Sequence, residues 1–120
     1  MDQKDEHSGV IMIDWDRVAE LRSEIGAEDF AEVVDMFLEE ADEVAETMQA
    51  KLAPDAVEAA LHFLKGSALN LGFRDLAQLC QIGEKAAACG DAQSVNLGQV
   101  VAIYQQSKLA FIAGKERYAA

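Results

Sequence analysis

The stretch EDFAEVVDMFLEEADEVAETMQAKL, residues 28–52, decides the fold class of this chain. Its apolar residues recur three and four positions apart, and acidic residues fill most of the positions between them. That spacing places an apolar stripe along a helix, and the acids of the first turn suit the positive end of the helix dipole. The positions predicted to face inward are Phe30, Val33, Val34, Phe37, Ala41, Val44 and Met48. We therefore expect a long amphipathic helix that packs against other helices.

Further helical patterns lie on both sides of this one. The sequence predicts them at residues 14–26, 54–72, 74–89 and 94–115. Asp14 and Pro54 suit the starts of helices, while Gly26 and Gly72 suit their ends. The apolar positions of the last helix include Val100, Ile103, Tyr104, Leu109 and Ile112. Because the turns are short, we predict an all-α fold, an antiparallel four-helix bundle with a short additional N-terminal helix.

The chain has the size of one ordinary domain, since 120 residues of which 51% are hydrophobic can bury a core. We expect a single domain at residues 14–120 and, before it, a flexible acidic tail at residues 1–13 that includes His7. Cys80 and Cys89 lie nine residues apart on one predicted helix, which is too far to form a disulfide. They fit no zinc pattern, and we expect both to be reduced and buried.

Charge is divided unevenly along the chain. Residues 1–60 carry 18 acids and 4 bases, whereas residues 61–120 carry 4 acids and 6 bases. The net charge of −12 would repel phosphates, which argues against nucleic acid and anionic membranes as partners. The sequence contains neither a membrane-length apolar run nor a signal-peptide core, so we expect a cytoplasmic protein.

In the basic half, the stretch LHFLKGSALNLGF at residues 61–73 places a histidine and a glycine inside a predicted helix. At about 100° per residue, the inward positions of this helix are Val57, Leu61, Leu64, Ala68 and Leu71. His62, Gly66 and Leu69 project to the opposite side, with Lys65 next to them, and Ser67 projects away from His62. A glycine inside a helix costs about 1 kcal/mol relative to alanine, and an exposed face does not need one for packing. We interpret Gly66 as clearance for something that docks on His62.

An exposed imidazole can serve several kinds of chemistry. A metal site would need further ligands, and hydrolysis would need an orienting acid and an oxyanion hole. Phosphoryl transfer depends mainly on in-line positioning and charge neutralisation, which an imidazole and the neighbouring ammonium of Lys65 can support. The pattern favours a phosphoryl acceptor, although each residue alone would also fit an ordinary solvated helix face.

The segment HFLKGSALNLG, residues 62–72, resembles the motif of histidine-containing phosphotransfer (HPt) domains of two-component phosphorelays. A lysine, a glycine, a serine and a second glycine follow the histidine by three, four, five and ten residues. The flanking segments DMFLEEADE and LAQLCQIGEKAAACGD are also similar to the family, and the resemblance covers roughly residues 14–115.

The resemblance implies a role for each residue of the motif. His62 would be the phosphorylated residue, Lys65 would stabilise the charge of the phosphoryl group, and Gly66 would leave room for a receiver domain. Ser67 would support the helix or the histidine, and Gly72 would end the helix.

The partners implied by the resemblance are a response-regulator receiver domain, a hybrid histidine kinase, or both. Docking would use apolar contacts from Ala59, Phe63 and Leu69. The family often has a polar side chain on the next helix that approaches the histidine, and the choice stays open between Gln81, Glu84 and Lys85. No cofactor or metal is expected in the chain itself, because Mg²⁺ would belong to the partner receiver.

Two functions remain as hypotheses. The first is a monomeric phosphoryl carrier, and not a kinase, because 120 residues leave no room for an ATP-binding domain beside the bundle. The second is a non-catalytic helical adaptor that binds a receiver or kinase domain without taking up phosphate.

Overall fold

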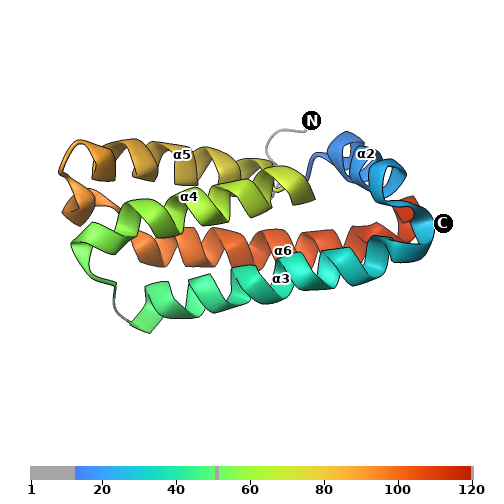
Figure 1. Ribbon diagram of the computed structural model, residues 1–120, viewed down its shortest axis with the longest axis horizontal. Helices are drawn as coiled ribbons and strands as arrows, with labels where there is room; N and C mark the ends of the chain where they lie inside the picture. Colours follow the sequence, from blue (N-terminus) through green and yellow to red (C-terminus); the bar gives the residue numbers. More distant parts are fainter. Residues whose placement is uncertain (1–12, 51, 120) are drawn as a thin grey trace, which may run out of the picture.

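The structure is a computed structural model that describes residues 13–50 and 52–119, with side chains described as far as Gly114 (Figure 1). All of its regular elements are helices: α2 (Trp15–Ile25), α3 (Ala27–Ala50), α4 (Pro54–Leu71), α5 (Arg74–Ala88), the short 3-10 helix η1 (Ala92–Ser94) and α6 (Leu97–Ala119). The predicted all-α class is therefore confirmed. Each predicted helix is present, with ends that differ from the expected ones by a few residues.

Of the tail expected at residues 1–13, only Ile13 lies within the described residues; the remainder, His7 included, lies outside them. Ile13 forms an isolated antiparallel bridge with Phe73, and its side chain packs against the core. It therefore belongs with the packed part of the chain.

The four long helices lie roughly alongside one another, and the chain reverses direction between them (Figure 1). The most extensive contact joins α4 to α5, and α3 and α6 also pack together. α3 touches α4 and α5 touches α6, while α2 lies at one end against α3, α4 and α6. Although α4 contacts α2, α3, α5 and η1, several of its residues remain exposed at the surface.

The core of α3 follows the predicted stripe in part, since Leu38 and Ala45 are buried although they were not predicted, and Val33 is only partly buried. Its buried residues are Phe30, Val34, Leu38, Ala41, Ala45 and Met48, while Phe37 and Val44 pack at the edge of the core. On α6 the stripe differs from the one expected, since Leu109 and Ile112 are exposed and Phe111 is buried instead. The reason is Ser107, which is buried in the inward row between Tyr104 and Phe111 and interrupts the apolar spacing.

The two cysteines are free, as predicted, but only one is buried. Burial, with the nearby Glu84 carboxylate adding to it, raises the pKa of the Cys80 thiol to about 12. Cys89 is exposed, which contradicts the expectation of two buried thiols. It lies directly after the last residue of α5, beyond the packed length of the helix.

α2 is anchored to the other helices at its first turn. The ring of Trp15 stacks on Phe111 with centroids 5.8 Å apart and planes 7° from parallel. Gly114 makes this possible, because a Cβ there would lie 2.5 Å from the indole Cζ2 of Trp15. At the start of α2, the Asp14 carboxylate accepts a hydrogen bond from the Arg17 backbone N–H at 3.2 Å, so the predicted N-cap is confirmed.

Gly72 joins the end of α4 to the start of α2. Its φ of 76° is left-handed, and its carbonyl accepts a hydrogen bond from the Asp14 N–H at 2.7 Å. A Cβ at Gly72 would lie 2.6 Å from the Asp14 carbonyl oxygen. The glycine therefore ends α4, as predicted, and also lets the backbone of α2 approach it closely.

Gly72→Ala is expected to lower the free energy of unfolding by about 3 kcal/mol, through left-handed strain and the clash with Asp14. Gly90→Ala is a matched control, because Gly90 has a φ of 85° and a Cβ there would meet nothing within 4 Å. The control is expected to lose only about 1–2 kcal/mol. Urea denaturation of both variants measures the difference, and equal losses would show that the approach of Asp14 imposes no constraint.

Candidate functional site

The projection of α4 into an inward and an outward face is confirmed. Its buried residues include Val57, Leu61, Leu64, Ala68 and Leu71, as predicted. The side chain of His62, in contrast, is 69% exposed. A core histidine is therefore excluded, and the imidazole is open to a partner.

Part of the surface around His62 is apolar or bare backbone. Leu69 is 58% exposed and Phe63 is 40% exposed. Ala59 is also exposed, and a Cβ added at Gly66 would meet nothing within 4 Å. We call Ala59, His62, Phe63, Gly66 and Leu69 the His62 strip. Exposed leucine and phenylalanine beside an open glycine make a surface against which another protein can pack closely.

The imidazole of His62 is held by a carboxylate of the neighbouring helix α5. Nδ1 of His62 lies 2.6 Å from Oε2 of Glu84. Nζ of Lys65 lies 2.8 Å from the other oxygen of Glu84, Oε1, and donates a hydrogen bond to Oε1 of Gln81 at 3.0 Å. The site therefore contains an imidazole and an ammonium that share one carboxylate.

Of the three α5 residues left open by the sequence, two contribute to this cluster. Glu84 contacts both His62 and Lys65, while Gln81 contacts Lys65 alone. Lys85 is exposed, and in the described part of the chain it is not brought to His62. Ser67 is 94% buried inside the packed helices (6% exposed), on a different side of α4 from His62. It cannot support the histidine by direct contact.

The carboxylate determines which nitrogen of His62 carries a hydrogen. The hydrogen bond from Lys65, and to a smaller degree that from His62, lowers the pKa of Glu84 below its ordinary value of 4.5. Glu84 is therefore ionised at neutral pH and can only accept hydrogen bonds. Nδ1 must then be the donor, which leaves Nε2 of the neutral imidazole with its lone pair directed away from α5.

This arrangement predicts how Glu84 affects stability as pH changes. Because its pKa is lower in the folded protein, ionised Glu84 stabilises the fold above about pH 4.5 and loses this effect as pH falls through the lowered pKa. The stability difference between wild type and Glu84→Gln is expected to shrink as the pH falls from about 5 through the lowered pKa. Urea denaturation across this range measures it, and a difference unchanged down to about pH 3 would contradict the ion pair.

An open groove next to His62 contains two acids that the sequence analysis missed. Asp55 and Glu58 line it together with Ala59, His62, Phe63 and Glu84. The spacing held a signal for them, because they lie seven and four residues before His62 and so share its helix face. One side of the histidine is therefore acidic, while Lys65 supplies positive charge on the side facing α5.

Among the described residues, no helix combines the length and apolar character that crossing a membrane requires. Within the same ranges, His, Cys, Asp and Glu side chains form no group of three or more that could hold a metal ion.

The described part of the chain is all-helical and carries an exposed histidine that contacts a carboxylate, with a lysine beside it. The family model of the Hpt domain matches residues 32–109, which is more than half of the chain, and the chain therefore belongs to this family. Membership links it to phosphotransfer in two-component signalling. No curated protein and no solved structure matches the chain. The matched segment contains α4 and α5 with the whole His62 cluster, whereas α2 lies outside it.

Proposed function

We propose that this protein is a phosphoryl carrier that accepts a phosphoryl group on Nε2 of His62 and passes it to or from a receiver-domain aspartate. The observation that carries the proposal is the 2.6 Å contact between Nδ1 and Glu84 on a ring that is 69% exposed. The contact keeps a hydrogen on Nδ1, and the exposure of the ring leaves Nε2 accessible to a partner. The four long helices would act as an antiparallel bundle that presents this ring to the partner.

The transfer step follows from this geometry. The lone pair of Nε2 forms a bond to phosphorus while the bond between phosphorus and the receiver aspartate oxygen breaks, and the aspartate leaves as a carboxylate. No proton has to leave His62, because Nδ1 keeps its hydrogen and the ring becomes cationic. The ionised Glu84 stabilises that cation across a 2.6 Å hydrogen bond.

Lys65 has a complementary role in the proposal. Its ammonium shares the Glu84 carboxylate with His62 and can offset the negative charge of the arriving phosphoryl group. Mg²⁺ and the acids that bind it would come from the receiver domain. The same groups serve the reverse transfer, since a cationic imidazole is a good leaving group when an aspartate attacks the phosphorus.

The partner in the proposal is a receiver domain that packs on the His62 strip, with Phe63 and Leu69 giving apolar contact and Gly66 allowing close approach. We place this exchange in the cytoplasm, with the protein acting as a monomer and the kinase activity residing in another protein or domain.

A direct test uses receiver domains of the source organism that carry radiolabelled phosphate from acetyl phosphate. The protein is expected to take up label as phosphate that acid hydrolyses and base does not, which is typical of phosphohistidine. NMR of the labelled protein is expected to place phosphorus on Nε2. Base-labile label, or phosphorus on Nδ1, would contradict the proposed acceptor atom.

A further inference from the structure

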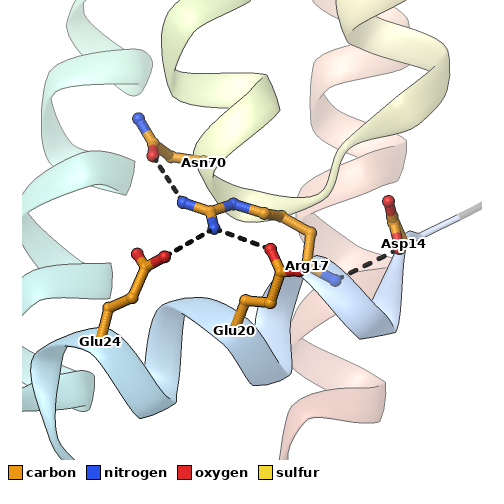
Figure 2. A network of polar contacts seen from close by, with 5 residues as sticks. All are labelled: Asp14, Arg17, Glu20, Glu24 and Asn70. Carbon is orange, nitrogen blue, oxygen red and sulfur yellow. Dashed lines mark hydrogen bonds and ion pairs between the residues drawn. The ribbon is translucent and has the colours of Figure 1, made fainter.

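A chain of polar contacts connects α2, which lies outside the matched family segment, to the His62 strip. Figure 2 shows the guanidinium of Arg17 between the side chains of Glu20, Glu24 and Asn70. Nη1 of Arg17 donates to Glu20 at 3.1 Å and to Glu24 at 3.4 Å. Nη2 donates to Oδ1 of Asn70 at 3.1 Å. The Arg17 guanidinium therefore contacts two carboxylates of its own helix and, at the same time, one side chain of α4.

The contact with Arg17 fixes the orientation of the Asn70 amide. A guanidinium only donates hydrogen bonds, so the oxygen of the amide must face Arg17 and the NH₂ group must face away. On that other side, Nδ2 of Asn70 donates to the backbone carbonyl of Gly66 at 3.1 Å. Arg17 is therefore the donor to Asn70, and Asn70 is the donor to the Gly66 carbonyl.

The carbonyl of Gly66 has a particular need for this second donor. Within an α-helix a carbonyl accepts one hydrogen bond from the backbone N–H four residues later, and a second lone pair stays available to water. Gly66 has no side chain to shield it, and the space where a Cβ would lie is open. A partner that packs on the glycine removes that water, and an unpaired carbonyl would then weaken binding.

We propose that Arg17 and Asn70 are positioning residues for docking: Arg17 orients the Asn70 amide, and the amide occupies the second lone pair of the Gly66 carbonyl, so that a receiver domain can pack against the bare backbone beside His62. This inference rests on the proposed phosphoryl carrier and extends its docking surface to α2. Neither residue touches the transferred group, so they act on partner binding and not on the chemical step.

Asn70→Asp tests the inference with little change of shape. The substituted side chain still accepts from Arg17, so α2 stays attached, but it has no hydrogen to donate to Gly66. The KM for a phosphorylated receiver domain is expected to rise roughly tenfold with kcat unchanged. The receiver used is the one that gives the fastest transfer to wild type. Thermal melting is expected to remain within a few degrees of wild type.

Two further variants separate positioning from general stabilisation. Arg17→Met should raise KM less than Asn70→Asp does, and the double variant should be no worse than Asn70→Asp alone, because both changes break one chain of contacts. Glu24→Gln is the matched control: its side chain is 62% exposed and contacts Arg17 but not Asn70, so its KM should equal that of wild type.

The outcomes distinguish the inference from the proposed function. Wild-type KM in Asn70→Asp would overturn the inference and leave the phosphoryl carrier intact. A fall in kcat, or a large loss of thermal stability in the same variant, would also overturn it in favour of a structural role. If wild type itself takes no phosphate from any receiver domain, the proposed function fails, and the inference fails with it.

Discussion

Replacement of His62 by glutamine is expected to reduce phosphate uptake from a phosphorylated receiver domain to background. Glutamine keeps a donor that can reach the Glu84 carboxylate, but it has no nitrogen lone pair that can attack phosphorus. Because the histidine side chain is 69% exposed, its loss leaves no cavity and the fold should be unaffected. The measurements are the label incorporated after incubation with the receiver and the thermal melting curve.

The same variant separates the two functions that the sequence leaves open. A phosphoryl carrier with His62→Gln should still bind the receiver domain, because Phe63 and Leu69 of the strip remain in place. It should not support signalling. If His62→Gln takes up as much label as wild type, the acceptor lies elsewhere; if it takes up none and still signals, the protein is an adaptor.

Gly66→Leu is expected to slow transfer on the order of 100-fold, because the added side chain holds the partner away from His62 and in-line transfer tolerates little misplacement. The free fold should not suffer. A Cβ at this position meets nothing within 4 Å, and leucine is the better helix former by about 0.8 kcal/mol. Transfer rates and thermal melting, measured on the same samples, show whether the two properties separate.

Gly66→Ala is the companion to this variant. It should raise stability by up to about 1 kcal/mol and slow transfer far less than leucine does, since a methyl group fills little of the open space. Unfolding of Gly66→Leu would show that the glycine packs inside the protein, and unimpaired transfer would show that the partner docks elsewhere.

The face on which His62 lies could be predicted from the sequence because it depends on a single helix. Each residue advances the helix by about 100°, so the positions of Leu61, Leu64 and Ala68 determine where His62 points. The same local logic predicted the helix end at Gly72, whose φ is positive. The apolar spacing did not predict the buried positions of α6, where the buried Ser107 interrupts the apolar row.

The contacts of His62 could not be predicted because they depend on two helices. Gln81, Glu84 and Lys85 all lie on α5, and the one that reaches the histidine is set by how α5 is rotated and shifted against α4. That register depends on packing: a Cβ at Gly83 would lie 3.0 Å from Cδ1 of Leu61, so this glycine lets the helices approach closely. The link from Arg17 to Asn70 is of the same kind, since it joins residues 53 positions apart.

The stacking of Trp15 on Phe111 gives the protein a built-in fluorescent reporter. The chain contains one tryptophan, so its intrinsic emission comes from the point where α2 rests on α6. An indole that leaves an aromatic neighbour and becomes hydrated emits at longer wavelength. Emission spectra can therefore follow the attachment of α2 while a receiver domain binds, without a label and without altering the His62 strip.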